Sequence, residues 1–194
     1  MQGDVPSMRE MILQEATALF LQRGYNGVSM REIAEACGLS KAGLYYHFTD
    51  KQALFLAILE ENMAALAQVI RRTKASSQST RERMAYFARA LFSQLAVNQR
   101  SIIRLASQEL RNLQPEAQER FLRQYHTEFI DAMAAMLEEG MQSGELCAMT
   151  PQTAAWALLG LLYPFLDIAA FDEEKHTRMI DDVLRIYFDG ISKK

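Results

Sequence analysis

The residues between positions 41 and 51 have the types and spacing that contact with double-stranded DNA requires. On a short helix this spacing leaves one face pointing outward. The outward positions are Lys41, Ala42, Tyr45 and Tyr46. Lys41 can donate hydrogen bonds to guanine or to phosphate, and the small residues Ala42 and Gly43 would let the backbone approach base edges in a major groove.

Polar side chains around this helix could also hold the neighbouring phosphates. Tyr45, Tyr46, His47 and Lys51 carry donors for phosphate oxygens, which fix the position of a protein on DNA without specifying sequence. The helix N-terminus favours phosphate as well, because its free N–H groups carry partial positive charge. An exposed Tyr-Tyr-His segment is equally compatible with an ordinary surface or a contact to another protein, so the residue types alone leave these alternatives open.

Two short helices joined by a tight turn would position these side chains. The predicted helices cover residues 30–37 and 41–47, and Gly38 between them tolerates the turn. Ser29 with Glu32 forms a capping box at the start of the first helix. The pattern therefore predicts a helix-turn-helix whose second helix faces outward.

The rest of the chain continues the helical pattern, which predicts an all-α fold of about nine helices. The predicted helices cover residues 7–23, 30–37, 41–47, 50–72, 79–95, 102–113, 115–140, 151–168 and 173–189. Thr49 with Gln52 predicts a capping box at the start of the fourth helix, and Pro164 predicts a kink in the eighth. No sustained alternation of polar and apolar residues indicates a sheet.

Composition narrows the class of protein. The chain has 194 residues, of which 49% are hydrophobic, so it can fill a core and is not a disordered chain. Cys37 and Cys147 are too few for a disulfide framework, and no signal peptide is evident. The charge-free apolar stretch at 153–166 is shorter than the roughly 20 residues of a membrane span. We therefore expect a cytoplasmic protein with no membrane partner.

Net charge does not favour nucleic acid by itself. The formal charge is −3, and residues 1–52 contain five basic and six acidic side chains, so DNA binding would depend on where a few charges lie. The sequence lacks Cys-x-x-Cys, a phosphate-binding glycine loop, a nucleophile elbow and His-Glu-x-x-His, and its three histidines lie far apart. We therefore expect no enzyme activity, no metal and no cofactor.

Several segments closely resemble the signature of the TetR family of one-component repressors. They are Ser-Met-Arg-Glu-Ile-Ala at residues 29–34, Cys-Gly-Leu-Ser at 37–40 and Lys-Ala-Gly-Leu-Tyr-Tyr-His-Phe at 41–48, followed by Lys51 and Leu54. The resemblance covers roughly residues 10–60, and Cys37 departs from the alanine that is usual in the family. It implies a tetracycline-repressor-like, all-α homodimer in which each subunit presents its helix-turn-helix to one half of a palindromic DNA operator.

The resemblance also implies roles for individual residues. Ser29 and Arg31 fall where the family contacts the DNA backbone. The base-reading positions are Lys41, Ala42, Gly43 and Tyr45, and the phosphate-contacting positions are Tyr46, His47 and Lys51. Residues 1–50 would form the DNA-binding domain and residues 51–194 a helical ligand-binding and dimerisation domain, connected by the helix at 50–72.

Flexible methionine and planar aromatic side chains in the second domain could line an apolar ligand site. The candidates are Phe87, Phe92, Leu105, Tyr125, Phe129, Met133, Met136, Trp156 and Tyr163. The same helical spacing suits an ordinary core, so both interpretations stay open. The last two predicted helices could form a four-helix bundle between two subunits, through Leu159, Leu162, Ile180, Leu184 and Tyr187.

Together these features favour a transcriptional repressor that is released from its operator by a small, largely apolar effector of unknown identity. The effector would move the two DNA-reading helices out of register with successive major grooves. Two alternatives stay open: control by a protein partner in place of a small molecule, and a helical enzyme with an incidental helix-turn-helix. Activation in place of repression is also compatible with the sequence.

Overall fold

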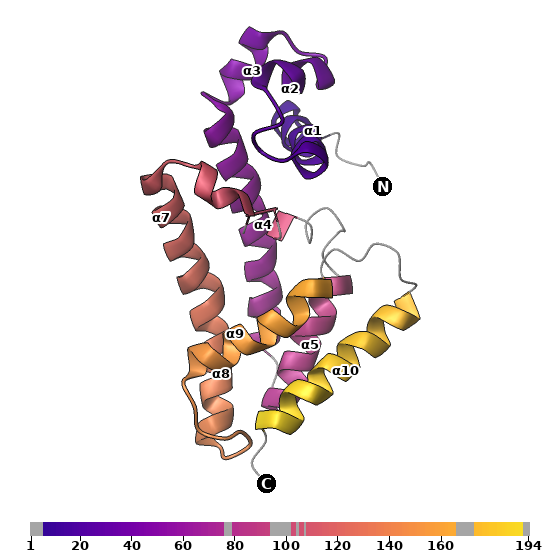
Figure 1. Cartoon of the computed structure of the whole chain (residues 1–194), viewed down its shortest axis with the longest axis vertical. Helices are drawn as coiled ribbons and strands as arrows, with labels where there is room; N and C mark the ends of the chain where they lie inside the picture. The colour runs from indigo at the N-terminus through magenta and orange to yellow at the C-terminus, as the bar shows by residue number, and fades with distance from the viewer. Residues whose placement is uncertain are drawn as a thin grey trace. The chain divides into compact units, whose positions relative to one another are not determined.

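Helices make up nearly all of the described structure (Figure 1). The computed structural model describes residues 6–75, 79–93, 102–103, 105–106, 108–165 and 173–191. The elements in chain order are α1 (Met8–Arg23), α2 (Met30–Ala36), α3 (Lys41–His47), α4 (Lys51–Lys74), α5 (Thr80–Ser93), η1 (Leu110–Asn112), α7 (Pro115–Tyr125), η2 (His126–Ile130), α8 (Asp131–Gln142), α9 (Pro151–Leu162), η3 (Tyr163–Phe165) and α10 (Glu173–Ile191). No strand occurs within these residues, and the predicted all-α fold is confirmed.

The chain folds into two compact units. The first contains residues 1–62 together with 101–121, and the second contains residues 63–100 and 122–194. The division falls inside α4, so this helix contributes its N-terminal half to the first unit and its C-terminal half to the second. The boundary predicted at residue 50 lies at the start of that helix, because a sequence pattern marks where a helix begins and not where its packing partners change.

Local hydrogen bonds define the ends of the first two helices. Ser7 and Glu10 form a reciprocal capping box at the start of α1, and Ser29 and Glu32 form the same arrangement at the start of α2. α1 ends at Gly24, whose φ of 72° lies in the left-handed region that favours glycine. The predicted limits of these helices are therefore confirmed to within a residue.

The start of α4 differs from the prediction. The side chain of Asp50, in place of that of Thr49, accepts a hydrogen bond from the backbone N–H of Ala53 at 2.7 Å. The side chain of Gln52 instead accepts from the backbone N–H of Gln114 at 2.8 Å. The predicted Thr49–Gln52 capping box is therefore wrong, because a partner far along the chain engages Gln52.

α4 is long and apolar. Among the described residues it is the one helix whose length and composition would allow it to cross a membrane, and 56% of its most apolar window is buried inside the protein. Its fully buried side chains include Leu54, Phe55, Ile58 and Leu59. Burial of this kind is typical of the central helix of a folded core.

In the second unit α5, α8, α9 and α10 pack together. α8 contacts both α5 and α9, and α10 contacts the same two helices. Each of the four contributes a fully buried side chain: Phe87, Met133, Leu158 and Phe188. The hydroxyl of Tyr187 donates a hydrogen bond to the carbonyl oxygen of Ala154 at 2.9 Å and so ties α10 to α9.

Irregular segments lie within two of the predicted helices. The helix predicted at residues 115–140 consists of α7 and α8 joined by η2, a π-helical segment with a wider turn. α9 passes into the 3-10 turn η3 at Tyr163, and Pro164 lies inside that turn. The α-helix therefore changes geometry at Pro164, as the predicted kink implies, since proline has no N–H to continue the α-helical ladder. Residues 166–168 of the predicted helix lie outside the described residues.

Candidate nucleic-acid interface

A polar network fixes the start of α2. The Ser29 hydroxyl accepts from the backbone N–H of Glu32 at 3.3 Å, and the Glu32 carboxylate accepts from the backbone N–H of Ser29 at 2.9 Å. Arg23, the last residue of α1, donates to Glu32 Oε1 at 2.7 Å and also to the carbonyl oxygen of Gly27. Hydrogen bonds from Ser29, and then from Arg23, lower the pKa of Glu32 to about 2. The ionised carboxylate therefore joins α1, the following loop and α2.

The turn between α2 and α3 is a Schellman motif. The N–H of Gly38 donates to the carbonyl oxygen of Glu35 at 3.1 Å, and the N–H of Leu39 donates to that of Ala34 at 2.8 Å. Gly38 has a φ of 67°, a backbone conformation that costs conformational energy for residues with a Cβ. These bonds end α2 and direct the chain straight into α3.

α3 has one buried face and one open face. Leu44 is fully buried and Phe48 is 5% exposed, so both attach the helix to the core. The Ser40 hydroxyl caps the helix by accepting from the N–H of Gly43 at 3.1 Å. The exposed side chains are those predicted to point outward, namely Lys41, Ala42, Tyr45 and Tyr46. Tyr46 is 87% exposed and Tyr45 is 40% exposed.

Aromatic rings and cations lie next to each other on the open face. The ammonium of Lys41 lies 5.7 Å from the ring centroid of Tyr45. The rings of Tyr46 and His47 meet edge to face, with centroids 5.3 Å apart. Gly43 and His47 are half-buried at the borders of this face. Such a surface offers hydrogen-bond donors to both base edges and phosphates.

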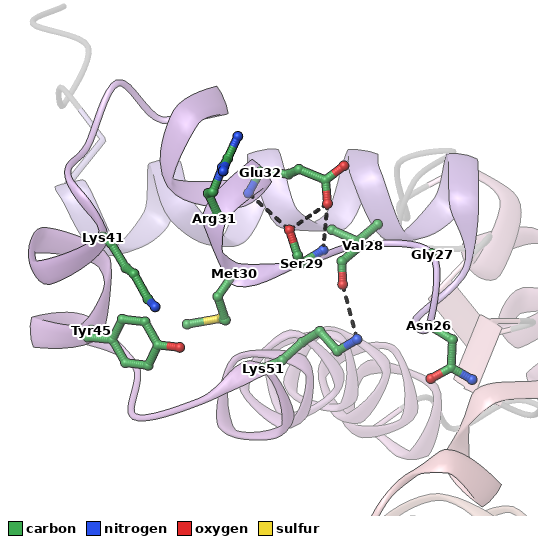
Figure 2. Close-up of a pocket in the computed structure, with 10 residues that line it drawn as sticks. All are labelled: Asn26, Gly27, Val28, Ser29, Met30, Arg31, Glu32, Lys41, Tyr45 and Lys51. Atoms are coloured by element: carbon green, nitrogen blue, oxygen red, sulfur yellow. Dashed lines mark hydrogen bonds between the residues drawn. The ribbon is translucent and has the colours of Figure 1, made fainter.

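An open cleft lies between the first residues of α2, α3 and α4 (Figure 2). Its lining residues are Asn26, Gly27, Val28, Ser29, Met30, Arg31, Glu32, Lys41, Tyr45 and Lys51. They include three cations and one anion, so positive charge prevails in the cleft. Five predicted site residues meet here, namely Ser29, Arg31, Lys41, Tyr45 and Lys51, whereas Ala42, Gly43, Tyr46 and His47 lie on α3 outside the lining.

The cations at this cleft have different partners. In Figure 2 the side chain of Arg31 points away from that of Lys51, and its Nε donates to Glu35 Oε1 at 2.9 Å. Both members of this ion pair are more than half exposed. Lys51 instead donates to the carbonyl oxygens of Tyr25 at 2.9 Å and of Val28 at 3.0 Å. Arg31 therefore presents its charge at the surface, whereas Lys51 is tied to the loop before α2.

Sequence reasoning missed four residues in and around this site, namely Arg23, Glu32, Asn26 and Gly27. Arg23 and Glu32 are nine positions apart, a spacing that follows no helical period, so only the fold brings their side chains together. Asn26 and Gly27 lie in the loop after α1, where no pattern distinguishes one exposed residue from another. The capping box did mark Glu32, although as a helix-capping residue and not as part of a cleft.

In the second unit, predicted effector-site residues form a row of aromatic rings. The ring of Tyr125 lies 5.3 Å from that of Phe129 and 6.2 Å from that of Trp156. Phe129 in turn lies 5.9 Å from Phe87, which is fully buried. Burial raises the pKa of Tyr125 above its ordinary range, so its hydroxyl stays protonated. The row runs from a half-exposed tryptophan into the core.

The other predicted effector-site residues are more scattered. Met133 and Met136 are fully buried, and Phe92 and Tyr163 are half-buried. Leu105 is buried as well, but it belongs to the first compact unit. The assignment of this whole group to one ligand site stays a prediction.

Four of the five predicted dimer residues are buried within the protomer. Leu162, Ile180, Leu184 and Tyr187 are each at most 5% exposed, and Leu159 is half-buried. In the described parts of α9 and α10, the large apolar side chains at the surface are Trp156, Leu161 and Ile186. A contact between two copies through these helices would therefore use this second group.

Comparison with known proteins covers both parts of the chain. Residues 12–58 match the family model described as "Bacterial regulatory proteins, tetR family". Residues 77–163 match the model described as "Tetracyclin repressor-like, C-terminal domain". The first match contains the complete helix-turn-helix, and the second extends from α5 to the start of η3.

Individual relatives are transcriptional regulators. The HTH-type transcriptional repressor AcnR of Corynebacterium glutamicum is 41% identical over 69 residues, or 35% of this chain, and the match spans only 37% of AcnR. The HTH-type transcriptional regulator UidR of Escherichia coli is 29% identical over 181 residues, which cover 89% of this chain and 87% of UidR.

A solved structure shares the fold. The crystal structure of AibR in complex with isovaleryl coenzyme A and operator DNA has a TM-score of 0.79 at 24% identity, covering 94% of this chain and 98% of AibR. Since the helix-turn-helix and the C-terminal region each match their own model of one family, the chain belongs to the TetR family of bacterial regulatory proteins.

Proposed function

We propose that this chain represses transcription by binding a palindromic DNA operator as a homodimer, and that a small, largely apolar effector releases it. The observation that carries the proposal is the open face of α3, where Lys41, Ala42 and Tyr45 are exposed and Leu44 anchors the helix from behind. A short helix held between a tight turn and the core, with an exposed donor at its first residue, has the arrangement of a recognition helix.

In the proposed complex the first half of α3 enters the major groove. Lys41, Ala42, Gly43 and Tyr45 contact base edges, Tyr46 and His47 contact phosphates, and Ser29 and Arg31 contact the backbone from the start of α2. Gly43 supports this orientation. A Cβ added there would lie 3.4 Å from Ser40 Oγ, an ordinary contact, so the fold tolerates a side chain at this position while a close approach to DNA would not.

The small number of cations sets the expected salt dependence. On the surface formed by α2 and α3, each subunit offers exposed positive charge through Arg31 and Lys41, and a dimer doubles these contacts. The logarithm of the binding constant falls by about 0.9 per neutralised phosphate as the logarithm of salt concentration rises. We therefore expect a moderate slope of the logarithm of the binding constant against the logarithm of salt concentration. Binding should also depend on correct spacing of the two recognition helices.

The aromatic row of Phe87, Tyr125, Phe129 and Trp156 supports an apolar effector site in the second unit. AibR, which shares the fold, has been crystallised with isovaleryl coenzyme A together with operator DNA. In our proposal the effector binds next to the row and shifts α4, the helix that both units share. Half-sites lie about 34 Å apart, so a shift of a few ångströms in the spacing of the two α3 helices weakens simultaneous docking.

Selection of bound fragments from a genomic DNA pool tests the proposal. The wild-type protein is expected to enrich a palindromic sequence with half-sites one helical turn apart. The double variant Lys41→Ala/Tyr45→Ala removes two exposed side chains of α3 and should enrich no sequence. Lys74→Ala, which removes an exposed lysine from the end of α4, is the matched control and should behave as wild type. Failure of the wild type to enrich any sequence would contradict DNA recognition.

Native mass spectrometry tests the effector and the subunit number. The purified protein is expected to appear as a dimer. A co-purified or added apolar ligand should increase the mass of the dimer and lower the fraction of operator DNA that stays bound to it. A ligand that binds without changing DNA affinity would contradict the regulatory part of the proposal, since an effector must bind the free and DNA-bound states with different affinity.

A further inference from the structure

We propose that Lys51 is a positioning residue, which holds the loop before α2 on the first turn of α4 and so sets the orientation of the helix-turn-helix. This inference rests on the proposed DNA-binding function. It differs from the role that the family resemblance implies, in which Lys51 contacts phosphate. The difference is testable, because a residue that neutralises a phosphate and one that organises the protein have different effects on salt dependence.

The ammonium of Lys51 is already occupied within the protein. It donates to the carbonyl oxygens of Tyr25 at 2.9 Å and Val28 at 3.0 Å, and it lies 4.3 Å from the ring centroid of Tyr25. Two of its three N–H donors are therefore used, and the ring attracts the same charge. Figure 2 shows the side chain extending from the start of α4 to Val28. Lys41, on the same cleft, is an exposed residue with its charge at the surface.

The groups that Lys51 holds are themselves part of the core. Tyr25 is 7% exposed and Val28 is 2% exposed. The ring of Tyr25 lies 5.7 Å from that of Phe20 on α1 and 5.0 Å from that of Phe55 on α4. Lys51 and Phe55 are four residues apart and so share one face of α4. α4 therefore contacts the loop at two points, through the ammonium of Lys51 and through the ring of Phe55.

The loop in turn places the start of α2. Val28 directly precedes Ser29, whose backbone and hydroxyl form the capping box with Glu32. If the loop is no longer attached to α4, α2 can move relative to α4. The expected consequence is loss of affinity for every DNA sequence, because α2 and α3 would no longer dock together in one orientation.

Neighbouring charges agree with a structural role. Burial lowers the pKa of Lys51, and the negative charge of Glu109 opposes this effect. Glu109 also lies next to the α1–α2 loop, since a Cβ added to Gly24 would be 2.9 Å from its Oε1. A carboxylate at this position is favourable for an internal lysine and unfavourable for an approaching phosphate.

The salt dependence of DNA binding by Lys51→Met and Lys41→Met distinguishes the two roles. Methionine keeps an unbranched side chain and removes the charge. We expect Lys51→Met to lower operator affinity about tenfold at every salt concentration, with the slope of log K against log salt unchanged, and to lower the melting temperature of the full-length protein. Lys41→Met should leave the melting temperature unchanged and reduce the magnitude of the slope by up to about 2 per dimer, because Lys41 brings its charge onto the DNA in the proposed complex.

A slope reduced by about 2 in Lys51→Met, with unchanged melting temperature, would overturn the proposal in favour of phosphate contact. Absence of any DNA binding by the wild type would instead contradict the proposed function, so the two failures are distinguishable. If Lys51→Met does not fold, ¹⁵N NMR of lysine ammonium groups in the wild type gives the answer. Without DNA, the ammonium signal of Lys51 should be protected from hydrogen exchange. Its chemical shift should stay the same when operator DNA is added. A change in the Lys51 chemical shift as large as the change at Lys41 would overturn the proposal.

Discussion

At the scale of single residues, side-chain chemistry distinguishes two kinds of proposed DNA contact. Tyr46 is 87% exposed and carries a hydroxyl on a rigid ring, which suits a phosphate oxygen on the outside of the groove. Ala42 is exposed near the start of α3 and offers only a methyl group, so it can touch a base edge without donating a hydrogen bond. Phosphates are present in every DNA sequence, whereas the base edges differ from one DNA sequence to another.

Tyr46→Ala and Ala42→Val should therefore have different signatures. Tyr46→Ala is expected to weaken binding to cognate and scrambled duplexes alike, by about fivefold, the value of one hydrogen bond. Ala42→Val should change the ratio of cognate to scrambled affinity by about tenfold or more, because the added methyl groups clash with or prefer particular bases. Fluorescence anisotropy with both duplexes measures the ratio. Equal effects of the two variants on both duplexes would contradict this division of roles.

The capping carboxylate of Glu32 gives a prediction about pH. Its pKa is about 2 in the folded protein against an ordinary value of 4.5, mainly through hydrogen bonds from Ser29. A lowered pKa means that the ionised form stabilises the fold above about pH 4.5, and that this stabilisation is lost as the pH falls toward 2. The melting temperatures of wild type and Glu32→Gln should differ by a constant amount near neutral pH, and this difference should shrink below about pH 4.5. A difference that is independent of pH down to 3 would contradict the assignment.

At the scale of elements, the turn between α2 and α3 depends on backbone conformation. Gly38 has a φ of 67°, and a Cβ added there would meet no atom within 4 Å. Any loss of stability on substitution therefore comes from the left-handed backbone and not from a steric clash.

Gly38→Ala should lower the free energy of unfolding by about 1 kcal/mol. Gly38→Asn is the matched comparison and should lower it less, because asparagine tolerates this conformation better than alanine. Urea unfolding of the full-length variants measures both values. Equal losses for the two variants would show that backbone conformation is not the cause.

The start of α5 depends on a residue far along the chain. Ser79 and Glu82 form a local capping box. The carboxylate of Glu145 also accepts from the backbone N–H groups of Thr80 and Arg81, each at 2.9 Å. A carboxylate at a helix N-terminus satisfies free donors and interacts favourably with the helix dipole.

Glu145→Ala should therefore lower the free energy of unfolding by about 1–2 kcal/mol. Glu138→Ala, which removes an exposed glutamate from α8, is the control and should change it by less than about 0.5 kcal/mol. Denaturant unfolding of the two variants provides the comparison. A loss no larger than that of the control would exclude Glu145 as a stabilising cap.

At the scale of the whole molecule, the proposed binding to a palindromic operator requires two copies of the chain. The apolar side chains that α9 and α10 leave at the surface are those that a subunit contact could bury, and Ile186, at 65% exposed, is the most open of them. Leu184 and Tyr187 serve the interior of each protomer instead. The same two helices can therefore build the core of one subunit with one face and a dimer with another.

Ile186→Glu should weaken the dimer by about tenfold or more, because a charge would be buried at the contact. The melting temperature of the isolated protomer should change little, since the side chain lies outside the core. Arg185→Gln, at the neighbouring exposed position, is the control and should remain dimeric. Analytical ultracentrifugation over a concentration series measures the association. A fully dimeric Ile186→Glu would place the subunit contact elsewhere.

Local chemistry explains which parts of the fold and site were predictable. The caps at Ser7 and Ser29 join residues three positions apart, and the outward face of α3 follows from helical periodicity. The cap at the start of α4 was predicted wrongly at Thr49, because Gln52 has a partner 62 residues away at Gln114. The π-helical segment η2 was also missed, since its side chains keep an apparently helical pattern.

The amino-acid sequence alone determined that this protein is helical, where most of its helices begin, and that a helix-turn-helix carries an outward row of Lys41, Ala42, Tyr45 and Tyr46. These properties depend on neighbours within a few residues, whose distances the helix itself fixes. The tertiary structure decided which side of α10 is interior, that Glu145 caps α5, and that Lys51 is tied to the carbonyl oxygens of a loop. Contacts of this kind join residues that are distant along the chain, and only packing of the helices sets the distance between them.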